Sequence, residues 1–214
     1  MGKDFVLLGA GGHARVLLEA LKQLGLFALI RGVLAPEMTD WQNNRLGLSW
    51  LGGDHALAGF SPLETQLLLG IGAIGVTETR SRVFEQNRMS GFEFASVIHP
   101  GAMVAADVVL GEGVQIMARS VVQTGSILAD NVLINTGAIV DHDCELDAHV
   151  HIASGAVLSG GVRVGRETFV GAGAVVRQGI TIGRKVVVGA GAVVVREVRD
   201  GTVVVGCPAK EITK

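Results

Sequence analysis

Residues 134–158 read INTGAIVDHDCELDAHVHIASGAVL, and the spacing of their large aliphatic residues decides the fold of the second half of the chain. Ile, Val or Leu stands at every sixth position of this stretch, and the rule holds without a slip from Ile98 to Val194. An α-helix repeats about every 3.6 residues and a strand every two, so neither accounts for this period. A repeat of six with inward-pointing aliphatic residues indicates a parallel β-helix.

The residues between the aliphatic positions predict where this β-helix turns. Three places after each aliphatic residue, most repeats carry Gly, Asn or Asp, which tolerate positive φ and so mark a corner. The next place holds a small or β-branched residue, which predicts a second inward column. The glycines at the richest corner lie 18 residues apart, so three repeats make one coil and the coils stack into a triangular prism; they are Gly137, Gly155, Gly173 and Gly191.

The composition agrees with a narrow aliphatic prism and excludes several classes of protein. Glycine supplies 31 of 214 residues and aromatic residues only 4%, while 49% are hydrophobic, which excludes disorder. The net charge of −2 gives no reason to expect nucleic acid or a membrane surface as a partner. Apolar runs are too short to span a bilayer, and the opening lacks a signal-peptide cleavage pattern. With only Cys144 and Cys207, we expect a cytoplasmic protein without disulfides.

The first 96 residues follow a different pattern, in which apolar runs alternate with helical spacing. We expect strands at 4–8 and 66–71, an apolar run at 27–34, and helices at 13–24 and from a Thr77 cap to Met89. This order predicts a small Rossmann-like α/β domain with a parallel sheet in residues 1–96. The β-helix would then occupy residues 97–198 and a closing segment residues 199–214.

A glycine turn links the first predicted strand to the first predicted helix. Gly9-Ala10-Gly11-Gly12-His13-Ala14 fits the G-x-G-x-x-A pattern, which places backbone N–H groups where a diphosphate can bind. The motif alone is weak evidence for a dinucleotide. A dinucleotide site calls for an acidic residue at the end of the second strand, where this chain has Leu34-Ala35-Pro36. An NAD-linked oxidoreductase is therefore the least favoured reading.

Five motifs together resemble one group of enzymes: GAGGHA at 9–14, IHPGA at 98–102, NTGAIVDHDC at 135–144, HIASGA at 151–156 and GCPAK at 206–210. The chain resembles the hexapeptide-repeat acyltransferases, and within them the sialic-acid and bacillosamine acetyltransferase group. This resemblance implies a left-handed β-helix, a homotrimer, and acetyl-CoA bound between subunits. It also implies acetylation of a sugar used in surface glycans.

His142 is the strongest catalytic candidate. It occupies a solvent-facing corner position between Asp141 and Asp143, and a carboxylate beside an imidazole fixes its tautomer and stabilises the imidazolium that forms. The resemblance implies that His142 is the general base, that Asp143 raises its basicity, and that Asn135 lies near it. Asp143 and Asn135 also fit simple turn positions, and both interpretations stay open.

The resemblance also implies binding residues. Acetyl-CoA contacts fall on His151, whose ring N–H could stabilise an oxyanion, and on Gly160, Ala172 and Ala190. The nucleotide sugar would bind Gly11, Gly12, His13 and Gly72, although the family's usual pair of Asp residues is replaced here by Ala35-Pro36.

Two further residues carry predictions of a structural kind. His149 matches no family position, and we expect it at the surface of a corner. Cys144 belongs to the small inward column, where a thiol behaves as a buried hydrophobe, so direct acetyl transfer is favoured over an acyl-cysteine intermediate.

These observations predict an acetyl-CoA-dependent N-acetyltransferase acting on the 4-amino group of a nucleotide-linked, UDP-type, amino-dideoxy sugar. A homotrimer would bring His142 of one subunit near the N-terminal domain of a neighbour. Two alternatives remain: O-acetylation of a sugar hydroxyl, as in sialic acid, and a noncatalytic sugar-nucleotide scaffold. We expect no metal ion.

Overall fold

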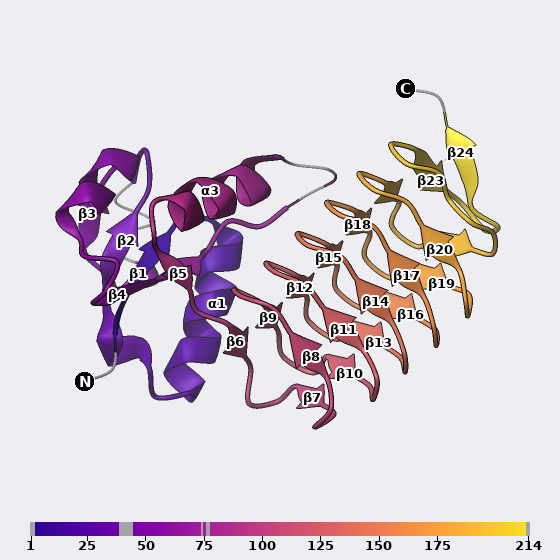
Figure 1. Ribbon diagram of the computed structural model, residues 1–214, viewed down its shortest axis with the longest axis horizontal. Coiled ribbons are helices and arrows are strands. Elements are labelled where there is room, and N and C mark those ends of the chain that lie inside the picture. Colours follow the sequence, from indigo (N-terminus) through magenta and orange to yellow (C-terminus); the bar gives the residue numbers. More distant parts are fainter. Residues whose placement is uncertain (1–2, 39–44, 74, 76–77, 213–214) are drawn as a thin grey trace.

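The computed structural model describes residues 3–38, 45–73, 75 and 78–212, and it divides into a parallel α/β layer structure and a long prism of stacked coils (Figure 1). The predicted Thr77 cap lies outside the described residues. The N-terminal sheet has the strand order β3-β2-β1-β4-β5, and all its pairs are parallel. Its strands are β1 (Asp4–Leu8), β2 (Ile30–Leu34), β3 (Trp50–Gly52), β4 (Thr65–Leu69) and β5 (Glu93–Phe94).

Two helices cover the two faces of this sheet. Helix α1 (Gly12–Gln23) buries an apolar stripe that includes Leu17 and Leu21, and this core continues into Met117 and Leu133 of the β-helix. Helix α3 (Glu78–Met89) places Phe84 against the opposite face. Two short 3₁₀ helices, η1 (Phe27–Leu29) and η2 (Asp54–Gly59), lie in the connections. The helix α1 is therefore held between the sheet and the prism, which fixes the first domain on the second.

The strand order of the N-terminal sheet indicates where a ligand can bind. The chain runs from β1 to β2 and β3 on one side, then crosses to β4 and β5 on the other. In open α/β sheets, ligands bind outside the carboxyl ends of the strands where this direction reverses. Here the reversal lies between β1 and β4, and the glycine turn after β1 stands beside the segment that follows β4.

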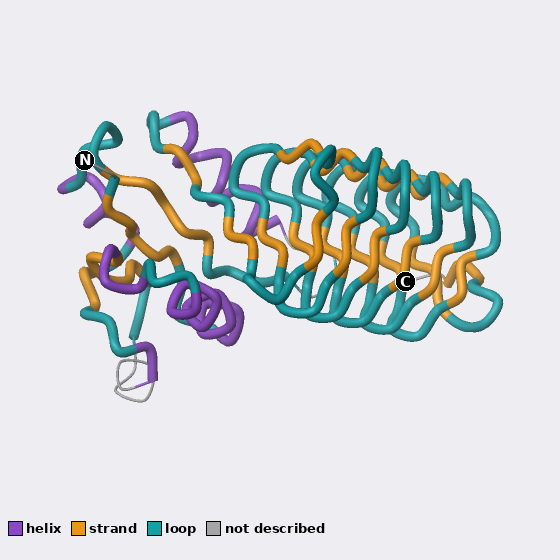
Figure 2. Tube along the Cα trace, turned by 90° about the horizontal axis from the view of Figure 1, so that it is seen from below, coloured by secondary structure: helices purple, strands orange, loops and turns teal. Residues whose placement is uncertain are grey.

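The second domain is the predicted left-handed β-helix, and Figure 2 shows its successive coils. Residue i pairs with residue i+18 along each face, as in Leu133 with His151 and Ile139 with Val157, so the three-repeat coil is confirmed. From β7 to β22, the second residue of each strand points inward and contributes to one continuous aliphatic core.

Three parallel sheets form the prism faces. The first contains β7 (Met103–Val104), β10 (Val121–Val122), β13 (Ile139–Val140), β16 (Val157–Leu158), β19 (Val175–Val176) and β22 (Val193–Val194). The second contains β8 (Val109–Leu110), β11 (Ile127–Leu128), β14 (Glu145–Leu146), β17 (Arg163–Val164) and β20 (Thr181–Ile182). The third contains β6 (Val97–Ile98), β9 (Gln115–Ile116), β12 (Leu133–Ile134), β15 (His151–Ile152), β18 (Phe169–Val170), β21 (Val187–Val188), β23 (Val203–Val205) and β24 (Lys210–Ile212).

The corner column adopts the left-handed conformation, with informative exceptions. Asn131 and Asp143 have φ of 57°, and most of the predicted corner glycines have φ between 66° and 73°. The same conformation is imposed on residues that do not favour it, namely Arg119, His149, Glu167 and Lys185, with φ between 52° and 62°. Gly101 and Asp107, in the first coil, do not share it. Stacking of coils therefore overrides local preference once the prism is established.

Within the described residues, no helix is long and apolar enough to cross a bilayer.

Candidate functional site

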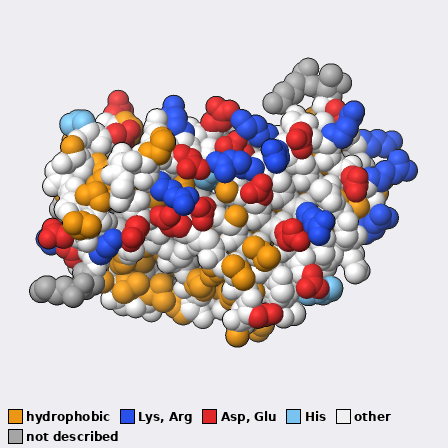
Figure 3. All heavy atoms as spheres, in the orientation of Figure 1, with side chains coloured by type: hydrophobic (Ala, Val, Ile, Leu, Met, Phe, Trp, Pro, Cys, Tyr) orange, Lys and Arg blue, Asp and Glu red, His pale blue; other side chains and the backbone are white. Residues whose placement is uncertain are grey.

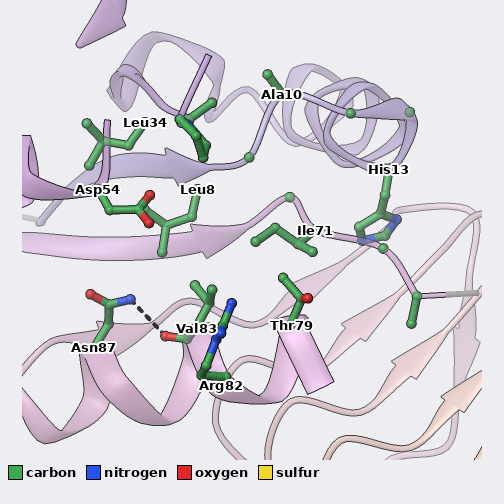
Figure 4. A pocket seen from close by; sticks show the side chains of 18 of the residues that line it. Leu8, Ala10, His13, Leu34, Asp54, Ile71, Thr79, Arg82, Val83 and Asn87 are labelled. Carbon is green, nitrogen blue, oxygen red and sulfur yellow. Dashed lines mark hydrogen bonds between the residues drawn. The ribbon is translucent and has the colours of Figure 1, made fainter. Parts of the chain in front are cut away.

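A cavity of about 980 Å³ lies between the N-terminal domain and the β-helix, at the reversal point of the sheet. Leu8, Leu34 and Ile71 line one side, while the α3 residues Thr79 and Val83 line the other (Figure 4). Figure 4 also shows His13 reaching from the start of α1 toward the chain that follows β4. The β-helix closes one end of the cavity with Asn135, Thr136, His151 and Ser154.

The glycine turn gives this cavity an anion-binding edge. Gly11 is the N-cap of α1 and has no side chain to satisfy the first N–H groups of the helix, and no acidic residue stands in the first turn. A Cβ atom added at Gly11 or Gly12 would meet nothing within 4 Å, so the backbone is open to a ligand. Free N–H groups at a helix start attract phosphate. At Gly72, an added Cβ would press against the Cβ of His13 at 3.2 Å.

A buried polar network joins the cavity to both domains. His13 Nε2 lies 2.7 Å from Gln115 Oε1, and Gln115 Nε2 donates to the Leu69 carbonyl at 3.0 Å. Arg80 donates to the Ile71 carbonyl at 2.6 Å and to Gln115 Oε1 at 3.3 Å. Burial, with the nearby Arg80 charge, lowers the pKa of His13 to about 4. His13 is therefore neutral at pH 7.

His151 and Asn135 meet at the β-helix end of the cavity. Asn135 Oδ1 accepts the Thr136 N–H, so its Nδ2 faces His151 Nε2 at 3.4 Å. Nε2 of His151 is then the acceptor and Nδ1 carries the proton, and Nδ1 is buried. Burial, together with Arg80 and His13, lowers the pKa of His151 to about 3. The ring N–H that the sequence suggested for an oxyanion thus points into the protein in this structure.

The dyad of His142 and Asp143 lies elsewhere, on an exposed corner of the β-helix. His142 Nδ1 is 2.8 Å from Asp143 Oδ2, and the two side chains are 47% and 69% exposed. The hydrogen bond to Asp143 raises the pKa of His142, with further support from the charges of Asp141 and Asp143. Nδ1 donates to the carboxylate, which leaves Nε2 free to accept a proton.

Two glycines make room for this dyad on the neighbouring coils. A Cβ atom at Gly160, one coil later, would overlap with Nε2 of His142, and one at Gly125, one coil earlier, would overlap with Oδ1 of Asp143. The free nitrogen of His142 therefore lies over the bare backbone at Gly160. The register of 18 residues explains both contacts, since it stacks equivalent corners.

The predicted site residues fall into separate groups on one chain. Gly11, Gly12, His13 and Gly72 line the cavity together with Asn135 and His151, whereas His142, Asp143 and Gly160 do not line it. Ala172 and Ala190 continue the corner of Thr136 and Ser154, as their spacing of 18 residues requires. Gly160 stands on the next corner, on the far side of the sheet that contains β13 and β16.

The expectation that His149 lies at the surface is wrong. Its side chain is 2% exposed and bonds Asn131 at 2.8 Å and Glu85 of α3 at 2.9 Å. Arg166 also bonds Glu85 at 2.8 Å. The corner is covered because α3 packs on it, a contact between distant segments that the six-residue pattern does not encode.

Arg80 and Gln115 were not singled out from the sequence. Gln115 offered one signal, since it stands in the outward column where most neighbours in the same sheet are apolar. Arg80 offered none, because an arginine in a polar helix is ordinarily exposed. Cys144 is buried as expected, and burial raises the pKa of its thiol to about 11. In the described ranges, no group of three or more His, Cys, Asp or Glu side chains is placed to hold a metal ion.

Comparisons with known proteins agree with both halves of the chain. Residues 4–87 match the family described as PglD N-terminal domain, and residues 161–196 match the hexapeptide repeat of succinyl-transferase. UDP-N-acetylbacillosamine N-acetyltransferase of Bacillus subtilis (strain 168) is 32% identical over 117 residues, which are 54% of this chain and 52% of that protein. The chain thus aligns with about half the length of this curated relative.

Solved structures match over the whole fold. The acetyltransferase domain of PglB from Neisseria gonorrhoeae FA1090, in complex with acetyl coenzyme A, is 38% identical, covers 99% of this chain and 100% of its own, and has a TM-score of 0.89. PerB of Caulobacter crescentus, in complex with CoA and GDP-perosamine, is 38% identical, with coverage of 98% and 97% and a TM-score of 0.87. A His-to-Asn variant of perosamine N-acetyltransferase from the same organism is 37% identical, with coverage of 99% and 97% and a TM-score of 0.89. With this identity over nearly all of both chains, the protein belongs to the family of hexapeptide-repeat sugar N-acetyltransferases.

Proposed function

We propose that this protein transfers the acetyl group of acetyl-CoA to the 4-amino group of a nucleotide-linked amino-dideoxy sugar. The observation that carries the proposal is the dyad of His142 and Asp143 over the bare backbone at Gly160. Nε2 of His142 takes the proton of the attacking amine, and Asp143 stabilises the imidazolium that forms. The relatives named above support an amine as the acceptor.

The acetyl group passes directly from the thioester to the amine. Cys144 is the only cysteine near the dyad, and its raised pKa keeps it as a thiol at neutral pH. Its Sγ donates to the Ser159 carbonyl at 3.4 Å, inside the prism. A buried thiol of this kind is a poor nucleophile, so an acyl-cysteine intermediate is disfavoured.

The cavity is the proposed site of the nucleotide sugar. Its diphosphate would bind the N–H groups at Gly11 and Gly12, and its sugar would extend toward His13 and Gly72. Asn135 at the β-helix end would contact the sugar nearest the reacting amine. The relatives act on UDP- and GDP-linked sugars by name, and Ala35-Pro36 leaves the choice of base to experiment.

We propose a homotrimer, because the outward residues on one face of the prism are apolar and would be exposed to solvent in a single chain. The outward residues of the sheet from β7 to β22 include Met103 at 65%, Ile139 at 38% and Val175 at 38% exposure. Figure 3 shows hydrophobic side chains along the lower side of the molecule, over the N-terminal domain and the first coils of the prism, where Figure 1 places β7. The full outward set is Met103, Val121, Ile139, Val157, Val175 and Val193.

A copy of this chain seated on that apolar face would complete the site. The face separates the corner of His142 and Gly160 from the corner of Ala172 and Ala190. Packing two copies along it brings one chain's dyad to the other chain's corner and cavity. Acetyl-CoA would then lie between subunits, with Gly160 on one side and Ala172, Ala190 and His151 on the other.

The division of labour follows the two folds. Residues 1–96 would bind the nucleotide sugar, residues 97–198 would carry the dyad and the acetyl-CoA edge, and residues 199–214 would close the prism. Both cysteines are free, which supports a place in the reducing cytoplasm.

The direct test measures release of the CoA thiol from acetyl-CoA with a panel of acceptors. The panel contains UDP- and GDP-linked 4-amino sugars, the matching 4-hydroxy sugars, sialic acid and simple amines. The proposal expects turnover with a nucleotide-linked amino sugar and none with the hydroxyl acceptors. Turnover only with hydroxyl acceptors would show O-acetylation, and sugar binding without turnover would show a scaffold.

A further inference from the structure

A buried arginine, Arg80, lies beside the cavity and has no carboxylate partner among the described residues. Arg80 is 3% exposed, and no salt bridge to it occurs within the described residues. Its Nη1 donates to the carbonyls of Leu69 and Ile71, at the carboxyl end of β4, and burial lowers its pKa to about 9. A buried cation without a carboxylate is costly, so the groups it does bond are informative.

The contacts of Gln115 fix the orientation of its amide. Arg80 can only donate, so the Gln115 atom that faces it must be the oxygen. The Leu69 carbonyl can only accept, so the Gln115 atom that faces it must be the nitrogen. Both conditions are met by one orientation, which Arg80 and β4 together impose.

That orientation decides the tautomer of His13. Gln115 Oε1 has no proton to give, so His13 Nε2, at 2.7 Å, must carry the hydrogen. In the neutral ring, Nδ1 is then a bare acceptor. Adding a second proton to this ring is opposed by burial and by the charge of Arg80. No hydrogen bond to Nδ1 occurs among the described residues, and His13 lines the cavity.

We propose that Arg80 and Gln115 are positioning residues that hold His13 as a hydrogen-bond acceptor, and that His13 Nδ1 takes a hydrogen bond from a hydroxyl or amino group of the sugar. This inference rests on the proposed binding of a nucleotide sugar in the cavity. Phosphate oxygens are acceptors too, so a bare Nδ1 repels them and leaves the diphosphate to the N–H groups at Gly11 and Gly12. His13 therefore selects for the sugar and not for the nucleotide.

The tautomer can be read without any turnover. Long-range ¹H–¹⁵N spectra of the full chain labelled with ¹⁵N-histidine distinguish Nε2–H, Nδ1–H and the imidazolium, and the loss of one signal in His13→Phe assigns the residue. We expect a neutral Nε2–H ring between pH 6 and pH 8. In Gln115→Leu we expect a mixture of tautomers. A His13 ring that is protonated, or carries its hydrogen on Nδ1, in the wild-type chain at pH 7 overturns the proposal.

Binding separates a sugar contact from a phosphate contact. In titrations without acetyl-CoA, His13→Phe should weaken binding of the nucleotide sugar about tenfold, which is the effect of one lost hydrogen bond. Binding of the free nucleoside diphosphate should stay unchanged. Equal weakening of both ligands would contradict the sugar contact. Gln115→Leu should follow the same selective pattern, and if it fails to fold, the wild-type spectrum still decides. A chain with the expected tautomer but no acetyl transfer would refute the proposed function alone.

Discussion

The molecule holds histidines in two opposite environments. His142 stands on an exposed corner with a carboxylate at 2.8 Å, and its pKa is raised. His13 and His151 lie in the crevice between the domains beside the Arg80 charge, and their pKa values are lowered to about 4 and about 3. The exposed His142 is therefore the stronger base, whereas His13 and His151 stay neutral at pH 7 and are suited to orienting and recognising a ligand. One chain holds the two sets apart, which is why we propose that two subunits complete the site.

The largest expected effect comes from removing the base. His142→Ala should lower kcat by a factor of about 10² to 10⁴, the usual contribution of a general base. Steady-state kinetics measure this, and titration with acetyl-CoA should show nearly unchanged binding, since His142 only faces the acetyl end. A variant with kcat near the wild-type value would remove His142 from the chemistry.

The next effect comes from the glycine under the base. Gly160→Ala places a methyl group against Nε2 of His142 and displaces the ring, so we expect kcat to fall about 10- to 100-fold. Gly59→Ala is the matched control, because an added Cβ there meets nothing within 4 Å and the residue lies outside the site. Equal kinetics for both variants would mean that the ring position does not matter.

A smaller effect is expected from the carboxylate partner. Asp143→Asn keeps a residue that tolerates the observed φ of 57°, so it tests the charge and not the turn. The base form of His142 exists above its raised pKa, so kcat/KM should rise with pH through that value. Loss of the Asp143 charge should move this rise to lower pH and lower the plateau about tenfold. An unshifted profile would make Asp143 only a turn residue.

The buried His13 and His151 should make the stability of the protein depend on pH. His13 and His151 bind protons more weakly when folded than the ordinary pKa of 6.5, so the unfolded chain binds more protons below that pH. The contribution of these two rings to the free energy of unfolding should therefore be complete above pH 6.5. It should decrease toward pH 4, by up to about 1.4 kcal/mol per pH unit for each ring. Urea unfolding at several pH values measures this slope.

Variants assign that slope to residues. His151→Asn should flatten the loss between pH 6.5 and pH 4, whereas His142→Ala should not, since the pKa of His142 is shifted the other way. The same slope in wild type and His151→Asn would show that His151 is not held neutral.

Much of the fold could be predicted, because the register of the β-helix repeats in the sequence as an aliphatic residue at every sixth position. The spacing of Ile134, Val140 and Leu146 indicates the β-helix from local sequence alone. A strand followed by a glycine turn indicates the first domain in the same way. The dyad could be predicted for the same reason, since His142 and Asp143 are neighbours in sequence. His149, Arg80 and Gln115 could not, because their partners are 64, 35 and 102 residues away and depend on how the domains pack.

Mixed trimers test most directly whether two subunits complete each site. Gly12→Asp puts a carboxylate where the diphosphate would bind and has open space for its side chain, so it disables the cavity half. His142→Ala disables the other half. Trimers that contain both chains, purified through two different tags, should recover about one third of wild-type activity, because each such ring has one intact pairing in three. Mixed trimers that form but stay as inactive as their parents would show that each site is built from one chain.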